Sequence, residues 1–538
     1  MGRKAGEDNI LGGIGLFMHS SLECGTSNLT KERFVLEKEY DQDELLHGIQ
    51  NALTAFARGG STATRSPLTA TKETSSAGEI KLGDVDANDR GPLKVLFLSA
   101  DTGGGHRASA ESLAAQFLRH FPGSTYDLLD VWTPCGVYPW KTLVDSYTHM
   151  SAHPRQWRFF FHTSNMFLSE KGADWHSNLF CGKGIRKRII EYDPDVVVCV
   201  HPAMTGSPSY QLARLSKKLG KHVPFYTVVT DLGTAHATWF RSKRCDKIYV
   251  ASDRIKKLAK RRGRFPDNKI VEAGLPIRQA FADEEEKLGD RTSEAGRAYQ
   301  ASVRKELDID TDRQMVLVMG GGEGVGGLET IVDELYTQFM KDGITASIYV
   351  VCGRNEKLKE SLASKDWSAL LTQERKTRKR DRVARIFKGG KKAEGETPTS
   401  ADETAKGDVK VVGLGFVTKM AEYMVGADVL VSKAGPGTIA EAACVGLPVM
   451  MTSFLPGQEA GNVDVVLENN FGEYNDKPVE ISEIVSGWLQ NPELLAEMSK
   501  NAKSVGRPHA AEEIVIDIGT CANAWKSLDS GAGRMSDL

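Results

Sequence analysis

The 538-residue chain is too long for one ordinary domain and long enough for two sizeable hydrophobic cores. Its hydrophobic fraction of 40% and charged fraction of 26% are typical of a globular protein, and a net charge of −2 gives no reason to expect nucleic acid as a partner. No apolar run reaches the ~18 residues that a membrane-spanning helix needs, so we expect any membrane contact to be at the surface. The eight cysteines form no CxxC pair, which argues against zinc knuckles and disulfide scaffolds and favours a reducing compartment.

Residues 1–90 form an N-terminal extension of mixed composition, which we expect to be partly disordered. It ends in a Ser-, Thr- and Gly-rich stretch that is typical of a linker. Glu7 and Asp8 come early, which is atypical of both a signal peptide and a transit peptide.

Downstream of this extension, apolar runs alternate with helical patterns in two series. The first series predicts a helix over 107–121 and strands at 94–100, 195–201, 224–231 and 247–252. An acidic connector follows, and the second series predicts strands at 314–322, 346–353, 409–414, 428–434 and 447–453. Because such alternation produces parallel sheets, we predict an α/β fold of two doubly wound, Rossmann-like domains facing a central cleft.

One segment interrupts the second series. Residues 374–392 hold ten basic residues against two acidic ones, and low-complexity sequence follows to about Asp408. A solvated insertion loop is the favoured interpretation, with contact to anionic lipid headgroups as the alternative.

The first of three glycine-rich turns is Gly103-Gly104-Gly105-His106, after the first strand. Consecutive glycines indicate that something comes close to the main chain. His106 is placed at the start of the next helix, where its side chain would project into the cleft. A neutral imidazole suits general-base chemistry near neutrality, and a capping or solvent-facing histidine is the alternative.

The second turn satisfies GxGxxG through Gly322, Gly324 and Gly327, so a dinucleotide site has to be considered. That motif requires an acidic residue at the end of the next strand, where this chain has Gly353 and Arg354 instead. An NADP-dependent oxidoreductase using Arg354 is therefore a distant alternative.

The third turn, at 435–437, leads into a helix that we expect to begin near Thr438. The unpaired amides of such a helix start suit a diphosphate. Glu441 lies about one turn further on and could reach a ribose diol, although acidic residues are also common at helix starts for structural reasons. The following loop carries side chains that suit a polyhydroxylated sugar, namely Gln458, Glu459 and Asn462.

These turns occur in the order found in GT-B glycosyltransferases. The stretches "DTGGGHRASAE", "HPAMT", "TDLGTAHATWF", "GLPIR", "MGGGEGVG", "KAGPGTIAEAACVGLP" and "GQEAGN" resemble the monogalactosyldiacylglycerol synthase family. This family is related to the bacterial N-acetylglucosaminyltransferase of peptidoglycan synthesis. The resemblance spans roughly residues 92–523 in consistent order.

The resemblance implies inverting transfer of galactose from UDP-galactose to the sn-3 hydroxyl of 1,2-diacylglycerol. It implies His106 as the general base, and Asp231, which ends the strand at 224–231, is the second candidate. On the donor side it implies that Glu441 holds the ribose and that Gln458 and Glu459 bind galactose. The remaining donor-site residues are Gly322, Glu323, Phe416 beside uracil, Gly437 and Thr438 at the diphosphate, and Asn462. Since no Asp-x-Asp pattern follows a strand, we expect no catalytic metal and no other cofactor.

The acceptor side is expected where aromatic residues gather. Eleven of the chain's 41 aromatic residues fall between Trp132 and Phe180, which suits a membrane interface, although for about half of them a helical aromatic core is the better interpretation. We expect Trp140 and its neighbours, in the loop "GVYPWK", to contact the interface, and Arg155 and Arg158 to contact an anionic activator such as phosphatidylglycerol. The other predicted acceptor-side residues are Gly104, Gly105, His236 and Trp239.

The resulting domain map has an extension at 1–90, an acceptor domain at 91–281 and a linker at 282–300. A UDP-sugar domain follows at 301–505 with the insert at 366–408, and 506–538 forms a helix returning to the first domain, then a tail. The family implies a peripheral protein of the plastid envelope, and a homodimer is compatible with the sequence. The alternatives are a related transferase that uses UDP-glucose or UDP-N-acetylglucosamine, and a non-enzymatic lipid-binding module.

Overall fold

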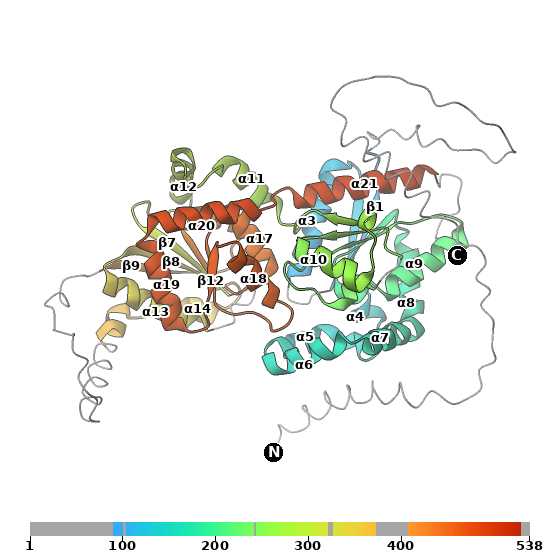
Figure 1. The fold of residues 1–538 in the computed structure, drawn as a ribbon, viewed down its shortest axis with the longest axis horizontal. Helices are drawn as coiled ribbons and strands as arrows, with labels where there is room; N and C mark the ends of the chain where they lie inside the picture. The colour runs from blue at the N-terminus through green and yellow to red at the C-terminus, as the bar shows by residue number, and fades with distance from the viewer. Residues whose placement is uncertain (1–89, 101–103, 242–243, 321–326, 373–406, 529–538) are drawn as a thin grey trace, which may run out of the picture.

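The computed structural model describes residues 90–100, 104–241, 244–320, 327–372 and 407–528 (Figure 1). The predicted donor-site residues Gly322 and Glu323 and the basic stretch beyond residue 372 lie outside these ranges.

The first domain is built on a six-stranded parallel sheet with the strand order β2-β1-β3-β4-β5-β6. Its central strands read as continuous apolar runs because both of their faces are buried, as the four buried residues of β3 illustrate. The strands are β1 (Lys94–Leu98), β2 (Thr125–Leu129), β3 (Val196–Cys199), β4 (Phe225–Val228), β5 (Lys247–Val250) and β6 (Ile270–Glu272).

Helices cover both faces of this sheet. The helices of the domain are α3 (Gly105–His120), α4 (Trp132–Cys135), α5 (Leu143–Ser151), α6 (Pro154–Ser164), α7 (Phe167–Phe180), α8 (Gly182–Tyr192), α9 (Ser207–Leu219) and α10 (Asp253–Leu258). One face packs against α8, α9 and α10, and the other packs against α3 and α21 (Ala510–Leu528) from the end of the chain. Helices α5, α6 and α7 form a separate layer along one side of the domain (Figure 1).

Helix α21 is fixed to the first domain by close packing and by buried polar contacts. A Cβ on Gly519 would overlap the ring of Phe121, so α21 and the end of α3 approach closely. The Lys247 ammonium lies 2.7 and 2.9 Å from the two carboxylate oxygens of Asp517, and the Tyr249 hydroxyl donates to the same carboxylate at 2.7 Å. Since Lys247 and Tyr249 belong to β5, the C-terminal helix is bonded directly to the sheet.

The second domain has a parallel sheet in the order β12-β11-β10-β7-β8-β9. Its strands are β7 (Gln314–Met319), β8 (Thr345–Val351), β9 (Asp408–Leu414), β10 (Val429–Ser432), β11 (Val449–Met451) and β12 (Gly472–Tyr474). The helices α13 (Leu328–Asp342), α14 (Glu356–Ser364) and α19 (Pro478–Leu489) cover one face. The opposite face carries α11 (Gln279–Leu288), α12 (Glu294–Glu306), α16 (Met420–Gly426), α17 (Pro436–Cys444), α18 (Ala460–Glu468) and α20 (Pro492–Val505).

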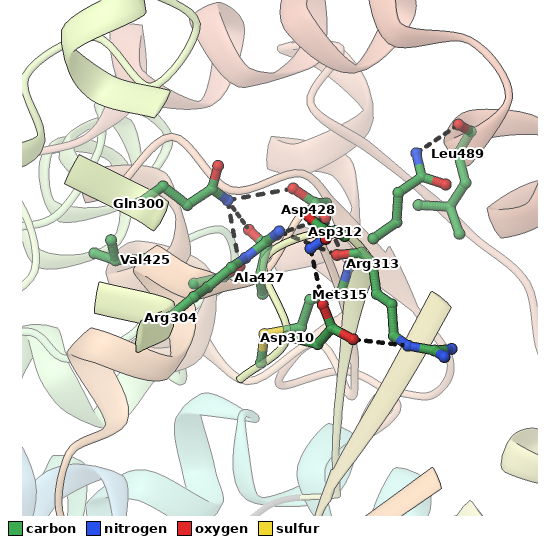
Figure 2. A network of polar contacts seen from close by, with 12 residues as sticks. Gln300, Arg304, Asp310, Asp312, Arg313, Met315, Val425, Ala427, Asp428 and Leu489 are labelled. Atoms are coloured by element: carbon green, nitrogen blue, oxygen red, sulfur yellow. Dashed lines mark hydrogen bonds and ion pairs between the residues drawn. The ribbon is translucent and has the colours of Figure 1, made fainter. Parts of the chain in front are cut away.

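The stretch expected as an acidic linker, 282–300, is helical and belongs to α11 and α12. Figure 2 shows how α12 is held: Arg304 bonds the Asp428 carboxylate at 2.8 Å, and the Gln300 amide donates to the Ala427 carbonyl at 3.2 Å. Asp428 also accepts the Met315 backbone amide of β7 at 2.7 Å. Most of the acidic residues in 282–300 are exposed, namely Asp283, Glu286, Asp290 and Glu294, whereas Glu284 is buried.

Candidate active site

The catalytic candidate His106 lies in the first turn of α3, directly after the glycine-rich turn. Its Nδ1 is 2.7 Å from the Thr230 hydroxyl, and its ring lies 4.7 Å from that of His201, centroid to centroid. Burial lowers the pKa of His106 to about 4, although a hydrogen bond with the Val200 carbonyl acts in the opposite direction. The imidazole is therefore neutral at pH 7, in the form that accepts a proton.

Asp231, the second candidate base, stands beside His106 just after β4. Its carboxylate accepts the Trp239 indole N–H at 2.6 Å, and the Trp239 ring lies 6.0 Å from that of His106. Burial raises the pKa of Asp231 to about 7, and the nearby Glu459 raises it further, whereas hydrogen bonds from Trp239 and Gln458 oppose the increase. His106 and Asp231, which can both accept a proton, therefore lie near the same buried side chain, Trp239.

The third glycine-rich turn leads into α17, which begins at Pro436, two residues earlier than predicted. Pro436 has no N–H to lose at this position, and its ring favours a helix start. The amides of Gly437 and Thr438 belong to the first turn, whose N–H groups lack intrahelical acceptors. Among the described residues, no atom lies within 4 Å of a Cβ built on Gly437, Gly104 or Gly105. The described part of the chain therefore leaves room beside the backbone at both helix starts.

Glu441 is buried in α17 and both of its carboxylate oxygens are occupied. The Arg278 guanidinium donates from Nε to Oε1 and from Nη2 to Oε2, each at 2.8 Å. Burial raises the pKa of Glu441, and Arg278 partly offsets this effect. A ribose diol would therefore share Glu441 with Arg278. Sequence reasoning assigned no role to Arg278, although it lies in the quoted stretch "GLPIR".

The loop before α18 carries the predicted sugar-binding residues. Glu459 is buried, with Oε1 at 3.0 Å from the Lys433 ammonium and Oε2 accepting the Leu455 amide at 2.9 Å. Gln458 is close enough to Asp231 to donate a hydrogen bond to it, so this loop reaches the catalytic candidates.

Asn462 differs from the prediction. Its Oδ1 accepts the Gly233 amide of the first domain at 3.0 Å, and its Nδ2 donates to the Ala434 carbonyl of the second domain at 3.0 Å. Because both ends of the amide are bonded to protein, this conformation links the two domains instead of presenting the amide to a sugar.

Phe416 is 74% exposed on the loop that follows β9, the edge strand of the second sheet. Within the described ranges, no group of three or more His, Cys, Asp or Glu side chains is arranged to hold a metal ion.

Comparisons with known proteins give the family of the chain. Residues 106–277 match the family described as monogalactosyldiacylglycerol (MGDG) synthase, and residues 348–514 match the glycosyltransferase family 28 C-terminal domain. The chain is 33% identical to "Monogalactosyldiacylglycerol synthase 1, chloroplastic" of Arabidopsis thaliana, over 84% of this chain and 74% of the relative. The chain belongs to the MGDG synthase family.

A second relative in the MGDG synthase family, "Monogalactosyldiacylglycerol synthase 3, chloroplastic" of Arabidopsis thaliana, is 35% identical over 79% of this chain and 80% of its own length. Among solved structures, MurG of Acinetobacter baumannii aligns over 79% of this chain and 99% of its own, with 14% identity and a TM-score of 0.46. This member of the MGDG synthase family is a glycosyltransferase of the GT-B class, as the sequence predicted.

Among the residues predicted for the acceptor side of this MGDG synthase family member, Trp239 is fully buried and His236 is held by two hydroxyls. His236 Nε2 lies 3.0 Å from the Ser164 hydroxyl of α6, and Nδ1 lies 2.8 Å from the Thr238 hydroxyl. Burial lowers the pKa of His236 to about 3, so the ring is neutral. Its ring packs edge-on against Phe161, which belongs to α6. Phe161 could not be found by motif because only the tertiary fold brings it here.

The loop expected at Trp140 is a short 3-10 helix, Trp140–Thr142. The indole stacks on the buried Trp132 at 4.7 Å and donates to His176 Nδ1 at 3.0 Å, so the ring is directed into the protein. Exposed rings nearby are Tyr138, two residues before Trp140, and Phe159, Trp175 and Phe180 on α6 and α7.

We define the apolar surface by the exposed large hydrophobic residues of this region: Val137, Tyr138, Phe159, Met166, Leu168, Trp175, Leu179 and Phe180. Leu168, Trp175 and Leu179 follow helical spacing on one face of α7. Arg155 and Arg158 are exposed on α6 beside Phe159. No helix in the described part of the chain is long and apolar enough to cross a bilayer.

Proposed function

We propose that the protein transfers galactose from UDP-galactose to the sn-3 hydroxyl of 1,2-diacylglycerol with inversion, forming monogalactosyldiacylglycerol for galactolipid synthesis. The observation that carries the proposal is a contact between the two domains: Asp231 of the first domain interacts with Gln458 and Glu459 of the second. His106 lies on the same side of this contact, because the Trp239 ring is 6.0 Å from His106 and its indole N–H donates to Asp231. The names of the relatives, at 33–35% identity, support the product.

In the proposed reaction, the acceptor oxygen attacks the anomeric carbon while the bond from that carbon to the diphosphate oxygen breaks. The hydroxyl proton passes to neutral His106, and the electron pair of the broken bond leaves with UDP. Asp231 is the alternative proton acceptor, because its pKa of about 7 also suits this role.

The donor would lie along the carboxyl ends of the second sheet. The amides of Gly437 and Thr438 face the developing charge on the diphosphate, which a helix start stabilises. Glu441 would take the ribose, the loop around Phe416 the uracil, and Gln458 and Glu459 the galactose hydroxyls. Gly322 and Glu323, outside the described ranges, complete the predicted donor site.

We also propose that the apolar surface docks on a bilayer. Exposed aromatic and aliphatic side chains beside Arg155 and Arg158 suit an interface that contains an anionic lipid such as phosphatidylglycerol. Since the relatives are named chloroplastic, the plastid envelope is the proposed location.

Purified protein would be assayed in mixed micelles of diacylglycerol and phosphatidylglycerol, with radiolabelled UDP-galactose or UDP-glucose and a chelator present. Wild type is expected to form galactolipid, and His106→Ala to lose turnover while still binding UDP. His509→Ala, an exposed histidine at the start of α21, is the matched control and should retain activity. Preference for UDP-glucose would contradict the named product, and full activity of His106→Ala would contradict the assigned base.

A further inference from the structure

We infer that the first domain positions the sugar-binding loop, 456–462, by holding it on both sides of Gln458 and Glu459. Asn462 is in this view a positioning residue together with Thr234, Gly461 and Gly457. The inference rests on the proposed function, because it assigns to the acceptor-side domain a part in recognising the donor sugar.

The downstream side of the loop is held by hydrogen bonds across the domain boundary. The Gly233 amide donates to Asn462 Oδ1 at 3.0 Å, and the Gly461 amide donates to the Thr234 hydroxyl at 2.9 Å. Asn462 is 1% exposed, so its bonds are shielded from competing water. Two backbones more than 200 residues apart in sequence are thereby paired by one amide and one hydroxyl.

The same contact requires glycine on both chains. A Cβ on Gly233 would overlap the Gly461 carbonyl, and a Cβ on Gly461 would overlap the Thr234 hydroxyl. Any larger residue at either position would push the domains apart at this point. Gly233 is two residues after Asp231, so the contact also fixes the distance between the sugar-binding loop and that carboxyl group.

The upstream side of the loop is held by aromatic packing. Gly457 has a φ of +89°, and a Cβ there would lie 2.6 Å from Cδ1 of Phe161. Leu455 packs on the cluster of Met150, Trp157 and Phe161 from α5 and α6. Helices of the first domain therefore cover the loop immediately before Gln458.

Gln458 and Glu459 lie between these two contacts, only one residue from Gly457 and two from Gly461. Distinguishing galactose from its C4 epimer depends on placing such side chains within a fraction of an ångström, and a misplacement of ~1 Å can cost about 100-fold in rate. A loop fixed at both ends by the other domain can hold that placement only while the domains are in contact.

Thr234→Val tests the inference with the least disturbance, because it keeps the side-chain shape and leaves the Gly461 amide without an acceptor. Thr234→Ser retains the hydroxyl. The matched control is Arg254→Ala, which removes a different contact between the domains. Arg254 pairs with Asp464 at 2.9 Å and with Glu468, two exposed carboxylates of α18. Each variant would be measured for kcat/KM with UDP-galactose and UDP-glucose, and for the Kd of UDP alone.

We expect Thr234→Val to lose about 10-fold in kcat/KM for UDP-galactose, as one buried amide without a partner predicts, and to show a reduced galactose-over-glucose ratio. The Kd of UDP should stay within about 2-fold, because the uridine and diphosphate contacts lie elsewhere. Thr234→Ser and Arg254→Ala should resemble wild type in the sugar ratio.

The inference would be overturned if Thr234→Val left the ratio of kcat/KM for UDP-galactose to that for UDP-glucose unchanged. It would also be overturned if Arg254→Ala changed this ratio as much as Thr234→Val does, because any weakening of the contact between the domains would then account for the effect. Gln458→Ala separates this failure from failure of the proposed function. If Gln458→Ala alters sugar use and Thr234→Val does not, the function stands and the positioning role falls. If wild type turns over another UDP-sugar instead, the named function fails, and the same ratios measured against that donor decide the positioning role.

Discussion

The pH dependence of kcat/KM distinguishes His106 from Asp231, because burial moves their pKa values in opposite directions, to about 4 and about 7. At pH 5.5 an imidazole with a pKa of about 4 is ~97% neutral, whereas a carboxyl group with a pKa of about 7 is only ~3% ionised. Lowering the pH from 8 to 5.5 therefore changes the active fraction by a few per cent if His106 is the base, and by ~30-fold if Asp231 is.

With His106 as the base, we expect the profile to stay flat down to about pH 5.5, in wild type and in Asp231→Asn. Initial rates would be measured at UDP-galactose concentrations well below KM, in micelles of fixed composition. Enzyme held at each pH and returned to pH 8 controls for inactivation. A tenfold fall per pH unit below pH 7 in wild type, absent from the residual activity of Asp231→Asn, would refute the assignment of His106 and make Asp231 the base.

Three further predictions concern stability and membrane binding. The folded-state pKa of Asp231 lies above its ordinary value of 3.8, so the protein loses stability as the pH rises from about 4 to 7. Asp231→Asn should therefore increase the free energy of unfolding at pH 8 by up to about 4 kcal/mol, with a higher Tm, and should barely change either quantity at pH 4. Calorimetry at both pH values measures the difference. The double variant Leu168→Asp/Trp175→Asp should bind diacylglycerol–phosphatidylglycerol vesicles about 100-fold more weakly than wild type in a sedimentation assay. Val479→Asp, at an exposed position on α19, is the control and should bind like wild type. Equal binding of wild type, the double variant and the control would contradict the proposed docking surface. Arg291→Met should lower the free energy of unfolding, measured in urea, by about 3 kcal/mol or more, because the buried guanidinium donates to four backbone carbonyls. A decrease of less than about 1 kcal/mol would contradict a stabilising role for these hydrogen bonds.

The fold was largely predictable because buried parallel strands appear in the sequence as continuous apolar runs. All nine apolar runs form strands. Eight of them are central in their sheets, where residues covered on both faces have to be apolar, and β9 is an edge strand that is only partly buried. The three strands that were missed are β2, β6 and β12, which lie at sheet edges. Strand β2 has exposed residues at three of its five positions, so it is not a continuous apolar run. Strands β6 and β12 are only three residues long, which is too short for a recognisable pattern.

The sequence named candidate residues for the active site, but it did not predict the contacts between them. Side chains that follow parallel strands meet at one edge of a sheet, so His106 and Asp231 could be expected to lie near each other. The pairing of Arg278 with Glu441 spans 163 residues, and that of Gly233 with Asn462 spans 229. No spacing in the sequence encodes these contacts, because they depend on how the two domains meet. The contacts of Trp140 were missed for a different reason: its partners Trp132 and His176 come from separate helices of the same domain, which only the packing of those helices brings together.

The return of α21 to the first domain means that the chain does not divide into two halves at a single cut. A fragment ending near residue 300 would lack one of the two helices that cover one face of its sheet, and would expose the core residues that face α21. Tyr249 and Lys247 would also lose the Asp517 carboxylate that neutralises this buried cluster. The first domain is discontinuous in sequence, with the second domain inserted between its penultimate and last elements. Chimaeras that exchange the second domain among relatives therefore need two junctions, one before α11 and one between α20 and α21.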